Sequence, residues 1–379
     1  LDDGWFGKRN NDKSSLGDWF VNTDKLPGSL KGLSEKVDKL GMSFGLWVEP
    51  EMISEDSDLF RKHPDWALRI QGREMHEGRN QYVLDMGRDD VVAYLTDVFT
   101  AVLGSADIKY IKWDMNRSIT ECYSIAYPAD QQGEIFHRYI LGVYDLYERL
   151  TSAFPEVLFE SCASGGGRFD PGMLYYAPQG WVSDDSDAVE RLKIQYGTSM
   201  CYPLSSMGSH VSVIPNHQVF RNTPLHTRAN VAYFGTFGYE LDLNKLSDAE
   251  IEEVKAQIRF MKEYRELLQF GTFYRLKSPF NGNETVWMVV SEDKSKALVG
   301  YYRVLNGVNL PYSCVKLQGL DPDKLYENEL ANTEHYGDEL MNLGLITTDV
   351  SAGEVPQGAE PCTDFESRIY LLKEKQSTN

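Results

Sequence analysis

Short apolar runs alternate with longer segments of helical period along the first 271 residues of the chain. This alternation is typical of strand-helix units repeated around a parallel sheet. We therefore predict an α/β fold, a TIM (β/α)8 barrel whose first strand is truncated. An eighth strand would end at residues 1–3, its body cut off by the start of the chain. The other predicted strands are residues 43–48, 81–84, 108–114, 157–162, 180–183, 210–213 and 237–241.

Helical periodicity between these runs supports the barrel. Residues 89–104 begin with two aspartates, carry an apolar stripe and end at Gly104, as expected for an amphipathic helix with acidic residues at its positive end. A second stripe runs from Ile135 to Leu150. Residues 247–269 open with Ser247 and Glu250 in the spacing of a capping box and end before Gly271.

The pattern changes after Gly271. Short β-prone runs follow one another, separated by turn signals such as Asn281-Gly282 and Asn306-Gly307. We predict two domains, a catalytic barrel over residues 1–271 and a small antiparallel β-sandwich domain over residues 272–379.

Composition narrows the classes of function. The formal net charge of −19, from 57 acidic and 38 basic residues, argues against nucleic acid or an anionic membrane as partner. No apolar run reaches the roughly 20 residues needed to cross a bilayer. Five cysteines without a CxxC pair indicate reduced thiols and a cytoplasmic protein. Seven histidines without an HExxH motif predict no catalytic metal, and we expect no cofactor.

Charged residues close the run at 108–111, where Lys112 and Asp114 follow apolar positions. Charges at the end of a buried strand are costly to desolvate unless they are paired or contact a ligand. The alternative interpretation is a structural ion pair at a strand end. Other runs also end in polar or aromatic clusters: Trp47 with Glu49 and Glu51, residues 160–162, and residues 181–187.

Residues at the carboxyl ends of barrel strands meet on one face, and here they include carboxylates, tryptophans and two cations. This set suits a polyhydroxylated sugar ring. Two carboxylates in one pocket can cleave a glycosidic bond, one as the nucleophile and the other as the acid. Asp114 is the better candidate nucleophile, because Lys112 two residues away favours its ionised form. Asp184, surrounded by Ser183 and further aspartates, is the better candidate acid. The alternative role of Asp184 is to cap a helix that begins near Asp187.

Four segments carry a resemblance to a known family. In order along the chain they are residues 1–7 (LDDGWFG), 112–117 (KWDMNR), 160–170 (ESCASGGGRFD) and 181–187 (WVSDDSD). They resemble the signature segments of glycoside hydrolase family 36, the bacterial-type α-galactosidases.

The resemblance implies a retaining α-galactosidase that acts on α-galactoside oligosaccharides such as melibiose, raffinose and stachyose by double displacement. It implies Asp114 as nucleophile and Asp184 as acid/base. Family members also have an N-terminal β-sandwich domain and form tetramers, so we expect this chain to be a fragment of a longer, homotetrameric enzyme. The implied substrate-binding residues are Asp2, Asp3, Trp47, Arg79, Lys112, Cys162, Gly165 and Trp181.

Three alternatives remain open at this point. A galactosyl transferase would use the same chemistry with a sugar as acceptor. An α-N-acetylgalactosaminidase would differ at the 2-substituent, near Cys162, where Ala163-Ser164 replaces the Ser-Gly of many members. A non-catalytic galactoside-binding barrel would explain the aromatics and carboxylates, but it gives no reason for Asp114 and Asp184 in their full motifs.

Overall fold

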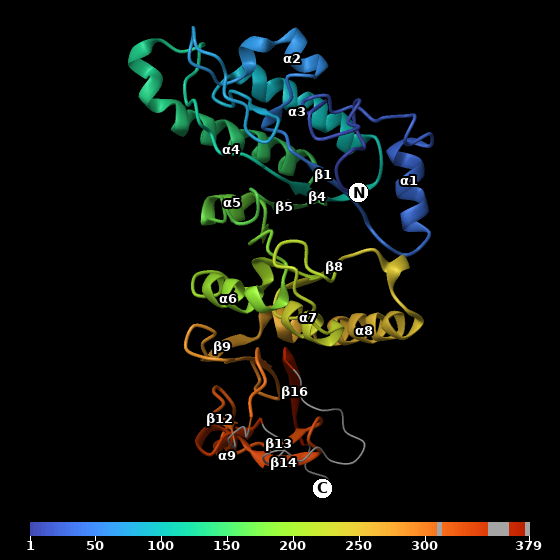
Figure 1. Cartoon of the computed structure of the whole chain (residues 1–379), viewed down its shortest axis with the longest axis vertical. Coiled ribbons are helices and arrows are strands. Elements are labelled where there is room, and N and C mark those ends of the chain that lie inside the picture. The colour runs from blue at the N-terminus through green and yellow to red at the C-terminus, as the bar shows by residue number, and fades with distance from the viewer. Residues whose placement is uncertain (309–312, 348–363, 376–379) are drawn as a thin grey trace. The chain divides into compact units, whose positions relative to one another are not determined.

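The computed structural model describes residues 1–308, 313–347 and 364–375 (Figure 1). The chain divides into two compact units, Leu1–Trp181 and Val182–Asn379. This division does not test the predicted domain boundary at residues 271 and 272, which stays a prediction.

The first unit contains a parallel sheet in the order β1-β4-β5-β6. In this sheet Val48 is level with Trp113, and Trp113 is level with Ser161. The carboxyl ends of the strands are therefore aligned, and the residues that follow them lie at one edge. The strands are β1 (Phe44–Val48), β4 (Ile108–Trp113), β5 (Leu158–Ser161) and β6 (Gln179–Trp181).

Helices of the first unit pack with these strands around one apolar core. Figure 1 shows α3 beside α4, the two long helices of this unit. In α3, Asp89 and Asp90 occupy the first turn, and the apolar stripe from Val91 to Val102 is buried. The helices are α1 (Ser29–Asp38), α2 (Asp58–Lys62), α3 (Asp89–Gly104), α4 (Ile135–Ala153) and α5 (Pro171–Tyr176), with short 3-10 turns at Pro64–Trp66 and Ala129–Glu134.

The second unit contains two parallel strands, β7 (Met207–Ser212) and β8 (Thr236–Glu240). Its helices are α6 (Ala188–Thr198), α7 (Leu225–Ala232) and α8 (Asp248–Phe270), with 3-10 turns at Leu204–Ser206 and Leu243–Lys245. The capping box predicted for α8 is present, because Ser247 and Glu250 exchange side-chain to backbone hydrogen bonds.

An antiparallel sheet follows in the order β14-β13-β16-β11-β10-β9. The apolar runs of β10 and β11 are buried almost throughout, and they pack into a separate apolar core. The strands are β9 (Thr272–Lys277), β10 (Glu284–Val290), β11 (Lys296–Arg303), β13 (Leu325–Asn328), β14 (Thr333–Tyr336) and β16 (Glu366–Glu374). A two-stranded sheet of β12 (Cys314–Val315) and β15 (Leu345–Ile346), together with α9 (Gly337–Asn342), completes the described part of this unit.

Parallel strands with covering helices, followed by an antiparallel sheet, confirm the predicted fold class. Two strand predictions were wrong in detail. Residues 81–84 contribute only β3 (Tyr82–Val83), which pairs antiparallel with β2 (Met52–Ile53) and lies outside the parallel sheet. Residues 1–3 form no strand, although Leu1 exchanges hydrogen bonds with Gly45 and Trp47 of β1, as a strand end would.

None of the helices in the described ranges has the length and apolar character required to span a lipid bilayer.

Candidate active site

Asp114 follows β4 directly, and the surrounding structure holds its carboxylate in one orientation. Its backbone N–H donates to the carbonyl of Val48 on the neighbouring strand at 2.8 Å. Trp47 Nε1 and Asn116 Nδ2 both donate to Oδ2, at 3.1 and 2.7 Å, and the backbone N–H of Met115 donates to Oδ1 at 2.8 Å. Such an ordered carboxylate is suited to attack an electrophilic carbon, because its direction is set before substrate binds.

Asn116 was not among the predicted site residues, yet it forms hydrogen bonds with Asp114, Arg79 and Glu49. Besides its bond to Asp114, its Oδ1 accepts from Arg79 Nη1 at 2.7 Å. Its backbone N–H donates to Glu49 Oε1 at 2.5 Å. Asn116 lies within the quoted KWDMNR segment, so its position could have indicated a contact with Asp114.

Lys112 points to a different carboxylate. Its Nζ lies 3.4 Å from Glu160 Oε1 and 4.6 Å from the ring centroid of Trp181. Glu160 also accepts from Gln179 Nε2 at 2.9 Å and from the Tyr110 hydroxyl. The predicted residues Lys112 and Trp181 are thus in contact, and Glu160 is the additional group that orients the ammonium.

Cys162 and the glycine run form the loop after β5. The backbone N–H of Cys162 donates to the carbonyl of Trp113 at 2.8 Å, which places the thiol beside the end of β4. Burial raises the pKa of the Cys162 thiol, and the charge of Asp114 raises it further, so the group stays protonated. Gly165 adopts φ +86°, a left-handed conformation that glycine accepts without strain.

Asp2 and Asp3 lie at the exposed start of the chain. Asp3 pairs with Arg9, whose Nη2 lies 3.0 Å from Oδ2, and Asp2 Oδ1 accepts from the backbone N–H of Asp3 at 2.8 Å. Trp5, which lies within the quoted LDDGWFG segment, is a core residue whose indole donates to the carbonyl of Trp47 at 2.9 Å.

Asp184 belongs to the second unit, where it is exposed. The residue that caps α6 is Asp187, which accepts from the backbone N–H of Val189 at 3.4 Å, so the alternative capping role does not apply to Asp184. Two arginines that sequence analysis missed hold this segment. Arg191 donates to the carbonyls of Ser183 and Asp185, both at 2.6 Å, and Arg221 pairs with Asp187 at 2.5 Å.

Two glutamates on the loop after β1, Glu49 and Glu51, are buried. Glu49 accepts from Gln81 Nε2 at 2.8 Å and from Asn116. Burial, with the nearby charge of Asp114, raises the pKa of Glu49 to about 7. Glu51 pairs with Arg168, whose charge and hydrogen bonds hold the pKa of Glu51 below its ordinary value against the effect of burial. The two glutamates were noted in the sequence only as polar residues at a strand end.

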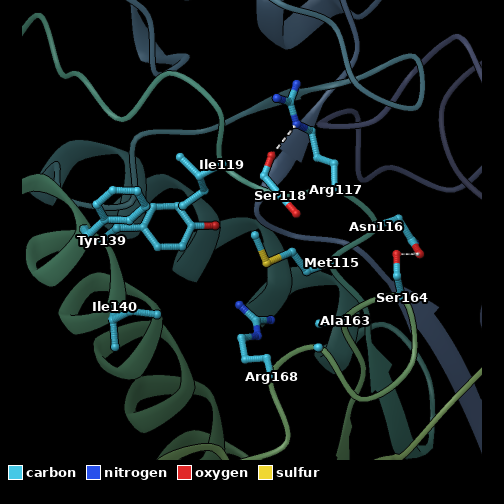
Figure 2. Close-up of a pocket in the computed structure, with 12 residues that line it drawn as sticks. Met115, Asn116, Arg117, Ser118, Ile119, Tyr139, Ile140, Ala163, Ser164 and Arg168 are labelled. Atoms are coloured by element: carbon cyan, nitrogen blue, oxygen red, sulfur yellow. Dashed lines mark hydrogen bonds between the residues drawn. The ribbon is translucent and has the colours of Figure 1, made fainter.

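A cavity of about 550 Å³ opens beside these groups (Figure 2). Asn116 and Ser164 lie on one side of it, Ile119 and Ile140 on the other, and Arg168 extends between them in Figure 2. Across the described ranges, no group of three or more histidine, cysteine, aspartate or glutamate residues is arranged to hold a metal ion.

Comparison with known proteins identifies the family of the chain. A profile of the Melibiase family matches residues 1–271, and a profile of the glycosyl hydrolase family 36 C-terminal domain matches residues 284–372. Alpha-galactosidase AgaA of Geobacillus stearothermophilus is 57% identical over 376 residues, which cover 99% of this chain and 50% of AgaA.

Solved structures agree with the sequence comparison. Crystal structures of AgaA variants in complex with raffinose and with stachyose each give a TM-score of 0.94 at 54% identity, covering 99% of this chain and 51% of that chain. The alpha-galactosidase from Lactobacillus brevis gives a TM-score of 0.95 at 50% identity, covering 100% of this chain and 51% of that chain. The chain thus spans about half the length of the relatives it matches.

Proposed function

Because this chain belongs to glycoside hydrolase family 36, with bacterial α-galactosidases among its relatives, we propose that the protein is an α-galactosidase. Its substrates would be oligosaccharides with terminal α-1,6-linked galactose, such as melibiose, raffinose and stachyose. The observation that carries this proposal is the Asp114 carboxylate, which three donors orient at the end of β4.

The proposed mechanism is a retaining double displacement. Asp114 attacks the anomeric carbon while Asp184 gives its proton to the leaving oxygen, so the glycosidic bond breaks as a galactosyl ester of Asp114 forms. Asp184 then takes a proton from water, whose oxygen attacks the same carbon and releases Asp114. Trp47 and Asn116 keep the attacking carboxylate directed through both steps.

The remaining predicted residues would bind the galactose ring. Lys112 and Arg79 would donate to ring hydroxyls, with Asp2 and Asp3 as acceptors, while Trp47 and Trp181 would supply apolar surface. Cys162 and Gly165 would form the wall near the 2-hydroxyl. Each role rests on the family motif and on the contacts above, and each is part of the proposal.

Two variants test the assignment of the two aspartates. Asp114→Ala should reduce turnover of an aryl α-galactoside by about 10⁴-fold or more, because the nucleophile is lost. Asp184→Ala should retain turnover of substrates with activated leaving groups, which need no proton, while it loses raffinose hydrolysis. The exposed aspartate Asp145, paired with Arg149 on α4, is the control, and Asp145→Ala should match the wild type.

Equal and small losses for Asp114→Ala and Asp184→Ala would reject the mechanism. Retention itself is tested by following the first product with NMR. A retaining enzyme releases α-galactose before mutarotation, whereas β-galactose as first product would contradict the double displacement.

The assembly and location are proposals as well. A homotetramer follows from the family resemblance, and light scattering of the complete polypeptide would test it. A cytoplasmic location rests on the cysteines, since Cys122, Cys162, Cys201 and Cys314 are all free thiols. Cell fractionation would test the location.

A further inference from the structure

The buried ion pair of Glu51 and Arg168 connects two parts of the site that the proposed chemistry treats separately. We propose that this pair is a positioning device, which sets the loop of Cys162 to Arg168 against the Asp114 end of β4 and so fixes the wall that faces the 2-hydroxyl of the sugar. The inference rests on the proposed function and adds residues to which that function gives no role.

Each carboxylate oxygen of Glu51 accepts two hydrogen bonds. Arg168 donates to both carboxylate oxygens, from Nη1 to Oε2 at 2.8 Å and from Nη2 to Oε1 at 2.7 Å. Trp113 Nε1 donates to Oε1 at 2.8 Å, and the Tyr139 hydroxyl donates to Oε2 at 2.5 Å. The Glu51 side chain is fully buried and that of Arg168 is 10% exposed. This one carboxylate therefore links the loop after β1, the end of β4, the helix α4 and the loop after β5.

Two of these partners lead directly to proposed site residues. Trp113 precedes Asp114, and its carbonyl accepts the backbone N–H of Cys162 at 2.8 Å. Arg168 ends a tight loop in which the N–H of Ala163 donates to the carbonyl of Gly165 at 2.9 Å and the N–H of Gly167 donates to that of Ala163 at 3.2 Å. A Cβ on Gly167 would lie 2.7 Å from the Ala163 oxygen, so this loop has little space to adjust within itself. Its placement is then set at its ends, by Cys162 and by Arg168.

The two hydrogen bonds between Arg168 and Glu51 favour a role in positioning over a role in stability alone. Apolar residues of similar volume commonly stabilise a fold as well as a buried ion pair does, so stability alone does not account for one here. A guanidinium that donates twice to one carboxylate fixes the relative plane of the two groups, which a lysine cannot do.

The first test is Arg168→Lys in the complete chain, assayed on an aryl α-galactoside and on its 2-deoxy analogue. A displaced wall should lower kcat/KM for the galactoside by about 100-fold, since small misplacements have effects of that size. The 2-deoxy substrate lacks the hydroxyl that faces this wall, so its kcat/KM should fall by less than about 5-fold. The matched control is Arg303→Lys, which alters the buried pair of Arg303 with Glu366 in the antiparallel sheet. This variant should leave kcat/KM unchanged for both substrates.

The second test uses the cavity beside Arg168. In Arg168→Ala, guanidinium ion at low millimolar concentration can enter this space and pair with Glu51, and it should raise kcat/KM for the galactoside about tenfold or more. Sodium chloride at the same concentration should not raise kcat/KM. Equal losses on both substrates, or no recovery with guanidinium in a folded Arg168→Ala protein, would overturn the positioning role. A wild-type protein that cleaves neither substrate would instead count against the proposed function.

Discussion

Glu49 and Glu51 are separated by one residue, are both buried, and lie in opposite electrostatic environments. Glu51 has a guanidinium and two neutral donors around it, and its pKa is lowered. Glu49 has only amide donors and a second carboxylate, Asp114, nearby, and its pKa is raised to about 7. The comparison shows that burial alone does not decide the charge of a carboxylate, because the partner groups do.

The contrast also separates two kinds of support for a site. Glu51, whose pKa is lowered, pairs with Arg168 and so connects the loops after β1 and β5. Glu49 accepts from the backbone N–H of Asn116, whose side chain donates to Asp114, and no cation pairs with Glu49 among the residues that the structure describes. Substitution at each residue should therefore affect different measurements.

The largest expected effect is on stability, in Glu51→Gln. The substitution leaves the Arg168 guanidinium buried without its counter-charge, so the free energy of unfolding should fall by about 3 to 5 kcal/mol. Urea denaturation of the purified protein measures this. Asp145→Asn, which breaks the exposed pair with Arg149, should change the same quantity by less than about 1 kcal/mol. Similar losses in the two variants would show that the Glu51 pair behaves like a surface pair.

The next effect is a dependence of stability on pH that belongs to Glu49. Its pKa is about 7 in the folded protein against an ordinary value of 4.5. Between these two pH values the Glu49 carboxyl is protonated in the folded state and ionised in the unfolded state. Stability from this group is then fully present below pH 4.5 and is lost as the pH rises to about 7, by about 3 kcal/mol.

Glu49→Gln should remove this loss of stability. The measurement is the unfolding free energy of the variant and of the wild type, each at pH 5 and at pH 8. The lowered pKa of Glu51 predicts the opposite sign, with stability that is present above pH 4.5 and is lost as the pH falls further. Parallel pH curves for the wild type and Glu49→Gln would contradict the raised pKa.

The smallest effect concerns the hydroxyls on α4. Tyr139→Phe removes one donor to the charged Glu51 and should lower the unfolding free energy by about 1.5 to 3 kcal/mol. Tyr147 is an equally buried tyrosine two turns along the helix, and within the described structure its hydroxyl has no hydrogen-bond partner. Tyr147→Phe should therefore be neutral or stabilising, and a loss equal to that of Tyr139→Phe would show that the Glu51 contact contributes nothing specific.

Regular patterns explain which parts of the fold could be predicted. The helices at Asp89–Gly104 and Asp248–Phe270 have a continuous apolar stripe and clear end signals, so local sequence was sufficient. The run at residues 81–84 is equally apolar, but it pairs with Met52–Ile53 outside the parallel sheet. A short apolar run shows that a strand is buried and does not show which strand it pairs with.

The candidate site divides in the same way. Asp114, Lys112 and Cys162 could be selected because strand ends in a parallel sheet share one edge, and the observed register aligns those ends. Arg168 stood within a quoted motif, but no rule of spacing connects it with Glu51, which lies 117 residues away along the chain.

The order of strands and helices, the net negative charge and the identity of the residues at strand ends are properties of the sequence, and they were accessible without coordinates. Three features depended on tertiary structure: which carboxylate pairs with a cation, which carboxylate has a raised pKa, and which tryptophan donates to Asp114. The physical reason is that these interactions act over a few ångströms between loops distant in sequence, so their strength and even their sign are set only when the chain has folded.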